Sequence, residues 1–555
     1  MQYKKSDYLH FALIVALILF LALLCLDNSC YWGDDFAAYI SEGIAIAEGR
    51  LQHQAEINVL MHPSALPDET RTGTLVYVWG YPLLLAIIYC LFGFDRTTFA
   101  TIIYYKLPSA VAMALLAGVL YLYLRRRFGN GLSFVLAFIF CAAYEFRVFI
   151  NTMYSDIVFL FFAMLSLLMA EIFLDEERVR PKIIKGIILG VLMWFTYEIR
   201  LNGISIIFAC ALEAVIACCR RIKSHIYIYI YSGRQRARDI CVTLLPFAAF
   251  VALKVISEAI LAPATGNTSD LSGCAIATIF SNLKIYYNSV CAWLSFVCDD
   301  AVINWIKKLM LLLNNGEDPY GVIQRLCGIL TELCVGAAML LCAAGVVLKG
   351  LRRELHLTIF SAVYLLIVCM LPYNQGVRYV YPVMILMPIY IGHALCAIGR
   401  ARILSFARHK AVRAAMRLAA FALCVLTFIS AVSGIIYTRN YKESIAFEPA
   451  GRAETLSGLN AYSPYAIEAY DYIINNTPAD CVIGFNKPRA LFLNTERLSI
   501  RTDVNGHSLD EVDYLLTCAT VGEKELERAG GESFREVFSN ADFTLYKKAD
   551  NIPQP

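Results

Sequence analysis

The sequence predicts an α-helical polytopic membrane protein with about eleven transmembrane helices, followed by a small α/β domain outside the membrane. Of the 555 residues, 59% are hydrophobic and 17% are charged, whereas an ordinary soluble domain carries roughly 25% charged residues. The apolar residues lie in blocks that are too long for aqueous cores, and after about residue 438 charged residues become frequent. The net charge of +3 gives no indication of a nucleic-acid partner.

The transmembrane helices are predicted from apolar blocks of ~18 or more residues, because a helix of that length crosses the ~30 Å hydrocarbon core and satisfies its own backbone hydrogen bonds. The first block, Tyr8 to Leu26, follows two lysines, as the apolar part of a signal peptide does. We interpret it as a retained span, because it is long and no small-residue cleavage site follows it. With this first block, the predicted spans are 8–26, 99–123, 131–153, 157–174, 184–199, 203–219, 240–262, 326–348, 356–373, 381–398 and 414–437.

The basic residues between these spans indicate the orientation of the protein. With the N-terminus in the cytoplasm, all the basic clusters fall on the cytoplasmic side, as the positive-inside rule requires. An odd number of spans then places everything after Thr438 outside. We therefore expect a multi-pass protein of the cell membrane with a cytoplasmic N-terminus and an extracytoplasmic C-terminal domain. The basic clusters lie at 125–127, 178–182, 220–238, 349–353 and 400–413.

The membrane domain, residues 1–437, is predicted to carry two large outer loops. The apolar run from Pro82 to Phe94 is too short to span, and if it did span, every later basic cluster would change sides. We interpret it as an interfacial helix. Residues 27–98 then form one outer loop with two juxtamembrane helices, Asp35 to Glu48 and Pro82 to Phe94, and residues 263–325 form the second loop.

The C-terminal segment, residues 438–555, has the pattern of a small α/β domain. Ser463 and Pro464 are typical of a helix start, and that helix is expected to end near Ile474. Short β-prone runs follow at 481–485, 490–493 and 543–546, with helical patterns at 509–517 and 522–537. The segment has no motif to which we assign chemistry.

Three carboxylates lie at the predicted outer face. Asp34 and Asp35 follow the first span, and Asp156 begins the fourth. Asp commonly occupies such positions as a helix cap, where its charge suits the helix dipole. The functional alternative is that a carboxylate beside the low-dielectric membrane acts as a general base on an acceptor hydroxyl or amine. The residues alone leave both interpretations open.

Arginines lie at the same ends of the predicted spans, namely Arg147, Arg200 and Arg378. Arginines at such depth commonly extend their charged heads to the interface. If these three converge on one face, they suit a phosphate group instead, because the guanidinium fork matches phosphate oxygens.

Several short motifs together resemble the GT-C membrane glycosyltransferases. Within GT-C, the sequence is most similar to glycosyltransferase family 39, which holds the dolichyl-phosphate-mannose protein mannosyltransferases and is similar to the bacterial aminoarabinose transferases of lipid A. The resemblance covers roughly residues 1–400 in layout. The motifs are Asp-Asp-x-x-x-Tyr at 34–39, Tyr-Val-Trp-Gly-Tyr-Pro-Leu-Leu-Leu at 77–85, Leu-Phe-Gly at 91–93, Arg-Arg-Arg-Phe-Gly at 125–129 and Tyr-Ser-Asp at 154–156.

This resemblance implies a polyprenyl-phosphate-linked sugar as donor and inversion at the anomeric carbon. By position, Asp34 would be the general base, and Asp35 would orient it or the acceptor. Asp156 would assist acceptor positioning or charge balance. Family members often carry Glu at the position of Asp35, and this chain has a single Pro82 in place of a common Pro-Pro pair.

The same resemblance implies a site for the donor phosphate. Arg378, in an Arg-Tyr-x-x-Pro context, resembles the arginine that holds this phosphate, and Arg200 and Tyr379 are further candidates. We expect no metal and no cofactor, since no His, Cys and Asp set has metal-ligand spacing.

We therefore expect an integral membrane glycosyltransferase that transfers a hexosyl or pentosyl group from a polyprenyl phosphate to an extracytoplasmic lipid, glycan or protein. The alternative is a non-catalytic transporter or flippase of lipid-linked sugars. A third possibility is a polysaccharide polymerase or ligase of another fold. Transporters commonly show internal repeats and ionisable residues at the membrane midplane, and this sequence has neither feature.

Overall fold

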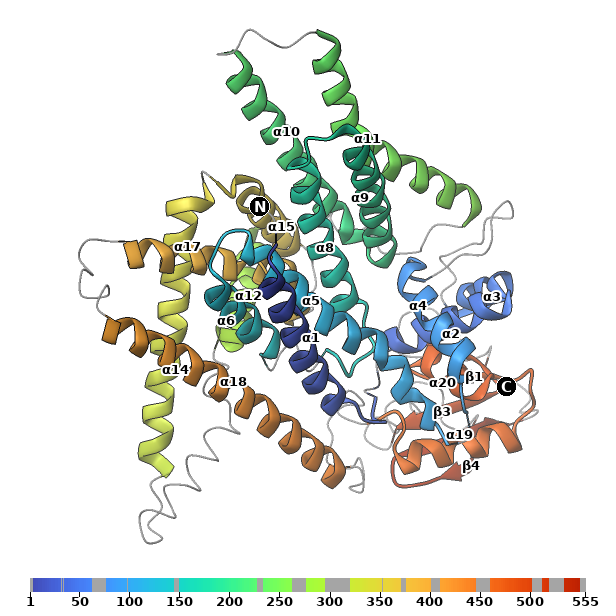
Figure 1. Ribbon diagram of the computed structural model, residues 1–555. Helices are drawn as coiled ribbons and strands as arrows, with labels where there is room; N and C mark the ends of the chain where they lie inside the picture. The colour runs from blue at the N-terminus through green and yellow to red at the C-terminus, as the bar shows by residue number, and fades with distance from the viewer. Residues whose placement is uncertain are drawn as a thin grey trace.

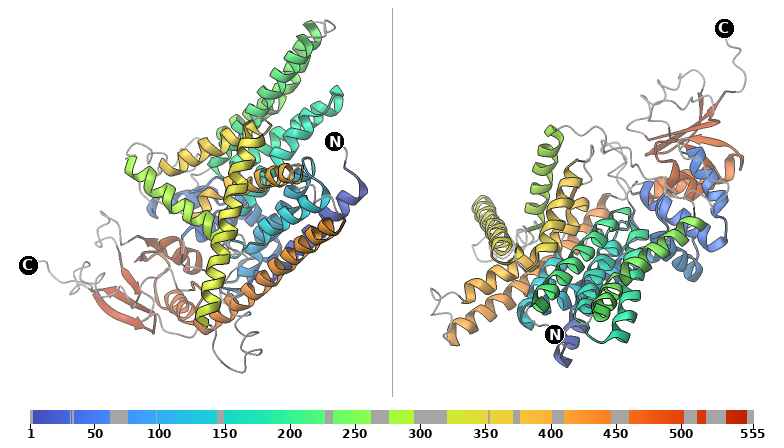
Figure 2. Two further views of the ribbon diagram at one scale, coloured as in Figure 1. Left: turned by 90° about the vertical axis from the view of Figure 1, so that its left-hand side faces the viewer. Right: turned by 90° about the horizontal axis from the view of Figure 1, so that it is seen from above.

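The computed structural model of the chain is a bundle of long helices with a small α/β domain packed against one end of it (Figures 1 and 2). The residues that it describes are 3–30, 32, 34–61, 76–96, 98–143, 149–226, 233–261, 276–294, 320–351, 353–370, 376–400, 410–445, 460–501, 512–518 and 534–549.

The bundle consists of apolar helices, which confirms a multi-pass membrane protein. Within the described ranges, seven helical stretches are long and apolar enough to cross a membrane, and four further apolar helices are shorter. The helices and helical turns are α1 (Lys5–Cys25), η1 (Ala100–Lys106), α5 (Leu107–Arg125), α6 (Asn130–Ala142), α8 (Asp156–Leu174), α9 (Val179–Ile199), η2 (Leu201–Gly203), α10 (Ile204–Ile226), α11 (Gly233–Ile260), α12 (Ile276–Leu294), α14 (Tyr320–Gly345), η5 (Val346–Gly350), α15 (Leu355–Met370), η6 (Gly376–Val380), α16 (Tyr381–Met384), α17 (Met387–Arg400) and α18 (Lys410–Ile445).

Helix α5 is packed on several sides, by α1, α6 and α8. Small residues allow this close packing, as they commonly do between membrane helices. A Cβ atom added to Gly118 would lie 2.5 Å from the ring of Phe11 on α1. The first and second predicted spans are therefore in direct contact along their length.

Two of the predicted membrane segments differ from the structure. The span expected at 131–153 is a shorter helix, α6, that ends at Ala142, and residues 149–153 form turns. Part of the expected outer loop 263–325 is the helix α12, whereas residues 263–275 and 295–325 lie largely outside the described residues. The buried Asn282 side chain interrupts the apolar pattern of α12, and it donates a hydrogen bond to the carbonyl of Cys369 on α15 at 3.0 Å.

Three helices lie between the first span and η1 in the part of the chain that the structure describes: α2 (Asp34–Glu48), α3 (Leu51–Met61) and α4 (Gly80–Phe92). Helices α2 and α4 correspond to the two juxtamembrane helices expected there, whereas α3 is additional. Helix α2 packs against α4. Helix α4 in turn starts against the end of α9, because a Cβ atom on Gly80 would lie only 2.5 Å from the carbonyl oxygen of Glu198.

The described residues of the C-terminal domain form a five-stranded mixed sheet and two helices, α19 (Pro464–Asn476) and α20 (Pro488–Thr495). The strand order is β2-β1-β3-β5-β4. Strand β1 pairs in parallel with β2 and β3, while β5 is antiparallel to β3 and β4. The strands are β1 (Val482–Gly484), β2 (Leu498–Ile500), β3 (Tyr514–Cys518), β4 (Phe534–Ser539) and β5 (Phe543–Lys548).

The expected α/β character is present, but two of the predicted elements have the other type of secondary structure. The β-prone run 490–493 lies inside α20, and the expected helix 509–517 overlaps strand β3. The run 490–493 and the end of the second run, Tyr514 to Leu516, are short and apolar, and such runs carry no periodicity that separates a strand from a helix. Pro488 at the first turn of α20 is the local signal that favours the helix.

The C-terminal domain packs against the residues just before helix α2 and forms hydrogen bonds with them. The Trp32 ring lies 5.5 Å from that of Phe485 and 5.6 Å from that of Phe543. The backbone N–H of Cys30 donates to the side chain of Asn460 at 2.9 Å, and its carbonyl accepts from Ala461 at 2.7 Å. The domain therefore fixes the position at which α2 begins.

Candidate active site

The carboxylate of Asp156 forms ion pairs with two arginines at one end of the helix bundle. It is the first residue of α8, and its side chain is 4% exposed. Arg200, which caps the end of α9, makes an ion pair with it through Nη1. Arg378, in η6, donates to the same carboxylate from Nε at 3.2 Å and approaches it with Nη2 at 3.1 Å. Three separate chain segments thus meet at one carboxylate.

Asp35 adds a second carboxylate to this group. Its Oδ2 lies 3.6 Å from Nη1 of Arg378, and its Oδ1 accepts a hydrogen bond from the hydroxyl of Tyr77 at 2.7 Å. The Asp35 side chain is 37% exposed, far more than that of Asp156. We call Asp35, Asp156, Arg200 and Arg378 the acid–arginine cluster. Asp35 is its solvent-accessible carboxylate.

Aromatic rings support the cluster. The guanidinium of Arg378 lies 3.9 Å from the centre of the Tyr154 ring, a cation–π contact. Tyr39 stacks on Tyr77 with the ring centres 4.2 Å apart, and its hydroxyl lies 3.0 Å from that of Ser155. These contacts hold helix α2 against the start of α8, so that the two carboxylates of the cluster stay close together.

Glu42 lies behind Tyr77 and is fully buried. Its Oε1 accepts hydrogen bonds from the backbone N–H groups of Val76 and Tyr77, the second at 3.3 Å. Burial raises the pKa of Glu42 to about 8, although the two N–H groups act in the opposite direction. Asp35, Tyr39 and Glu42 have the spacing i, i+4, i+7, which places them on one face of α2.

Asp34 points away from this face, toward the C-terminal domain. Burial raises its pKa, and Arg489, Lys487 and the backbone N–H of Ala490 at the start of α20 act in the opposite direction. Its Oδ1 is buried and has no hydrogen-bond partner within the described part of the chain. The structure therefore brings Asp35, and not Asp34, to Asp156 and the arginines.

The remaining candidates from the sequence have different positions. Tyr379 follows Arg378 and is half-buried against the hydrophobic core. Arg147 lies outside the described residues. The sequence patterns indicate no role for Tyr77 or Glu42. The signal that could have found Glu42 is its spacing from Asp35 and Tyr39 on an expected helix.

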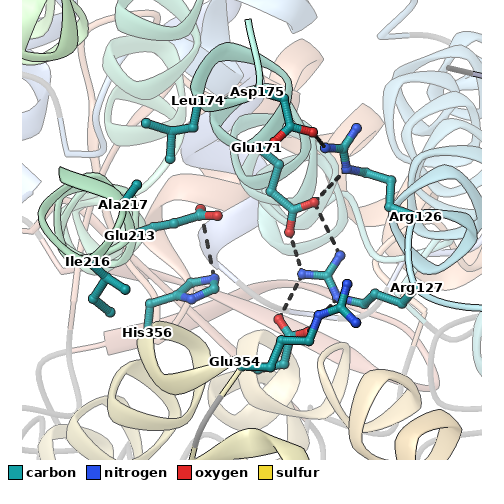
Figure 3. A pocket seen from close by; sticks show the side chains of 11 residues that line it. Arg126, Arg127, Glu171, Leu174, Asp175, Glu213, Ile216, Ala217, Glu354 and His356 are labelled. Atoms are coloured by element: carbon teal, nitrogen blue, oxygen red, sulfur yellow. Dashed lines mark hydrogen bonds and ion pairs between the residues drawn. The ribbon is translucent and has the colours of Figure 1, made fainter. Parts of the chain in front are cut away.

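A second charged group lies at the opposite end of α8, about 22 Å from Asp156 at ~1.5 Å of rise per residue. We call Arg126, Arg127, Glu171 and Glu354 the far-end cluster. Arg127 bridges Glu171 and Glu354, with Nη2 at 2.8 Å from Glu354. These residues border a cavity of about 490 Å³ (Figure 3), whose full lining is Arg126, Arg127, Glu171, Leu174, Asp175, Glu213, Ile216, Ala217, Arg353, Glu354 and His356.

The far-end cluster differs from the acid–arginine cluster in the pairing of its charges. Arg126 and Arg127 are each paired with two carboxylates, and His393 adds a contact to Glu354 at 3.1 Å. Figure 3 shows the side chains of Arg126 and Arg127 pointing toward the carboxylates of the far-end cluster. The pairs join the ends of α5 and α8 to the start of α15, and we assign them a structural role.

Comparisons with known proteins agree with this architecture. Residues 79–232 match the family model described as dolichyl-phosphate-mannose-protein mannosyltransferase. No curated protein sequence matches the chain. Among solved structures, ArnT from Cupriavidus metallidurans bound to undecaprenyl phosphate is 12% identical, with a TM-score of 0.51 and 100% of both chains covered. Its apo form gives the same identity and TM-score over 96% of this chain and 97% of that one.

An oligosaccharyltransferase from Archaeoglobus fulgidus in its apo form is also similar. It is 14% identical, with a TM-score of 0.46, over 98% of this chain and 75% of that one. The helix bundle, the helices after the first span and the C-terminal domain are all included in the coverage of ArnT. The chain therefore has the fold of the GT-C membrane glycosyltransferases, the group that its sequence motifs resemble.

Proposed function

We propose that the chain is a membrane glycosyltransferase that moves a sugar from a polyprenyl phosphate to an acceptor at the membrane surface. The observation that carries this proposal is the position of Arg378, which lies between a buried carboxylate, Asp156, and an accessible one, Asp35. The match to ArnT bound to undecaprenyl phosphate supports the choice of donor. The sugar and the acceptor are left open.

In this proposal Arg378 and Arg200 bind the donor phosphate. Asp156 holds both guanidinium groups at one point, and guanidinium forks bind phosphate oxygens in a bidentate manner. The contact of Arg378 with Asp35 is longer than its contacts with Asp156, 3.6 Å against 3.1 and 3.2 Å. An incoming phosphate takes the place of Asp35 beside Nη1. As the sugar leaves, the two arginines stabilise the growing charge on the phosphate.

Asp35 is the general base that this geometry favours. Once released from Arg378, its Oδ2 can accept a proton from the acceptor, while Tyr77 keeps its hydrogen bond to Oδ1. Attack from the side opposite the phosphate inverts the anomeric carbon in a single displacement. Asp34 remains the candidate suggested by motif position. Its contacts with the C-terminal domain give it a supporting role in this scheme.

The proposed topology places the site and the C-terminal domain on the same, extracytoplasmic face. Helix α2 carries Asp35 and also contacts α20 of the domain, so both lie at one end of the bundle. The far-end cluster, which includes Arg126 and Arg127, lies at the other end, where the positive-inside rule expects the cytoplasm. The proposed boundary between the membrane and C-terminal domains is near residue 438, although helix α18 continues to Ile445.

The test uses the purified chain in lipid nanodiscs with a panel of radiolabelled polyprenyl-phosphate sugars and a cell-envelope extract as acceptor. Transfer of label to the extract is expected for at least one donor, Asp35→Asn abolishes it, and Asp34→Asn retains it. The opposite pattern would assign the base to Asp34. A chain that moves the donor across the bilayer with its sugar–phosphate bond intact would be a transporter, and this outcome would overturn the proposal.

A further inference from the structure

One face of helix α2 connects the accessible carboxylate of the cluster to a fully buried one. Asp35 and Glu42 are separated by two turns of the helix, and Tyr39 lies between them. Buried carboxylates are rare because removing the charged form from water is unfavourable. The position of Glu42 therefore calls for a reason in the structure around it.

The contacts of Glu42 supply that reason. Its Oε1 accepts from two successive backbone N–H groups, those of Val76 and Tyr77. Two hydrogen bonds to one oxygen fix both the position and the direction of this stretch of chain at the start of the segment that leads into α4. Without this acceptor, the two N–H groups would lose their partner in this half-buried stretch of the chain.

The held segment reaches directly into the candidate active site. The Tyr77 ring stacks on Tyr39, and the Tyr77 hydroxyl donates to Oδ1 of Asp35 at 2.7 Å. A hydrogen bond to one carboxylate oxygen sets the rotation of the carboxyl group, so that Oδ2 is the oxygen that faces Arg378. The orientation of Asp35 thus depends on where Tyr77 is held.

We infer that Glu42 is a positioning residue of the transfer reaction, which keeps Tyr77 hydrogen-bonded to Asp35 and thereby directs the second oxygen of Asp35 toward the donor and acceptor. This inference rests on the proposed function with Asp35 as the base. Glu42 itself is fully buried and presents no surface to a substrate. Its action passes through Tyr77, and this predicts that the effects of changing the two residues are coupled.

The main experiment is a double-mutant cycle on Glu42 and Tyr77. Glu42→Met removes the acceptor at similar length, and Tyr77→Phe removes the hydroxyl. Each is expected to lower kcat ~10- to 100-fold, as for the loss of one hydrogen bond to a charged group, with little change in the KM for the donor. The double variant is expected to be no slower than the slower single variant, because both changes break the same link.

Two matched variants separate positioning from stability. Glu42→Gln keeps an oxygen acceptor for both N–H groups and is expected to retain kcat. Glu48→Met changes another glutamate of α2 that accepts a hydrogen bond from a tyrosine, Tyr89, away from the cluster, and it is expected to leave kcat unchanged.

Val76→Pro removes one of the two N–H donors while Glu42 stays in place, and it tests the link between Glu42 and Tyr77 if Glu42→Met fails to fold. It is expected to lower kcat.

A readout that needs no activity keeps this inference separate from the proposed function. 3-Fluorotyrosine at position 77 gives a fluorine resonance that is expected to shift or broaden in Glu42→Met and to stay unchanged in Glu42→Gln and Glu48→Met. If no donor is used but the resonance responds in this way, the proposed function fails and the link between Glu42 and Tyr77 stands. Multiplicative effects on kcat in the cycle, or an unchanged resonance in Glu42→Met, would overturn the inference.

Discussion

Asp156 and Arg378 are 222 residues apart in the chain, yet their side chains meet at 3.1 and 3.2 Å. Arg200 approaches the same carboxylate, so that one buried negative charge faces two positive charges. Such an arrangement leaves one positive charge in excess at Asp156, and Asp35 offsets it. In the proposed mechanism, a phosphate that replaces Asp35 therefore enters a site that already suits a negative charge.

Asp156→Asn is expected to destabilise the protein as well as stop transfer. Removing one partner of a buried ion pair costs roughly 3 to 5 kcal/mol, because the remaining charges lose their compensation. Thermal unfolding in detergent measures this loss. Asp175→Asn, whose side chain is 59% exposed beside Arg126, serves as the control and is expected to unfold near the wild-type temperature. Equal stability of the Asp156 and Asp175 variants would contradict the account.

Arg378→Lys is expected to weaken use of the donor more than use of the acceptor. A lysine keeps the charge but loses the planar fork and the stacking on Tyr154. The KM for the donor should rise ~10-fold or more, as for the loss of one hydrogen bond to a charged group. Steady-state kinetics with donor and acceptor varied in turn measure this. Arg353→Lys, an exposed arginine at the other end of the bundle, is the matched control. An unchanged donor KM would argue against the phosphate role.

Changes in the far-end cluster are expected to affect folding and leave the chemistry unchanged. Arg127 is 5% exposed and joins Glu171 to Glu354, so Arg127→Met leaves two buried carboxylates without their common partner. We expect a loss of several kcal/mol in stability and an unchanged KM for the donor in the fraction that folds. Unfolding temperature and kinetics on the monodisperse fraction measure the two effects. A large change in donor KM would instead connect this cluster to the active site.

The pKa of Glu42 predicts how stability depends on pH. Burial raises this pKa from 4.5 to about 8, so between these values the folded protein binds more protons than the unfolded chain. Stability therefore falls as the pH rises from about 4.5 to about 8, and the contribution is constant above that range. Glu42→Gln lacks this titration. Its advantage in unfolding temperature over the wild type is expected to grow from pH 5.5 to pH 8, and a constant difference would contradict the prediction.

Much of this architecture follows from simple patterns in the sequence. Apolar blocks predicted the helices, and the acidic and basic residues at their ends predicted that Asp156, Arg200 and Arg378 lie on one side. These predictions work because a membrane separates the two ends of each span. The sequence pattern does not predict helix α12, because Asn282 interrupts its apolar residues. The partner of the Asn282 side chain, the carbonyl of Cys369, lies on α15 and is 87 residues away in the sequence.

Sequence patterns do not determine which of Asp34 and Asp35 faces the acid–arginine cluster. Successive residues on a helix point roughly 100° apart, so only one of two neighbours can face the cluster. Which one does so depends on how α2 is rotated between α4 and α20. That rotation is set by tertiary contacts, such as those of Trp32 with the C-terminal domain, and no local pattern in the sequence records it.

The pairing of Cys30 with Asn460 also has a consequence for how the protein is made. These residues are 430 positions apart, and at ~5–20 residues per second the ribosome needs roughly 20 to 90 s to pass from one to the other. In the proposed topology, the segment that carries Asp35 is already across the membrane during that interval, without the domain that anchors it. If Asp35 is the base, as proposed, catalytic competence is acquired late in synthesis, after the C-terminal sheet has formed, and a chain truncated before residue 460 is expected to insert its helices but to leave Asp35 unanchored.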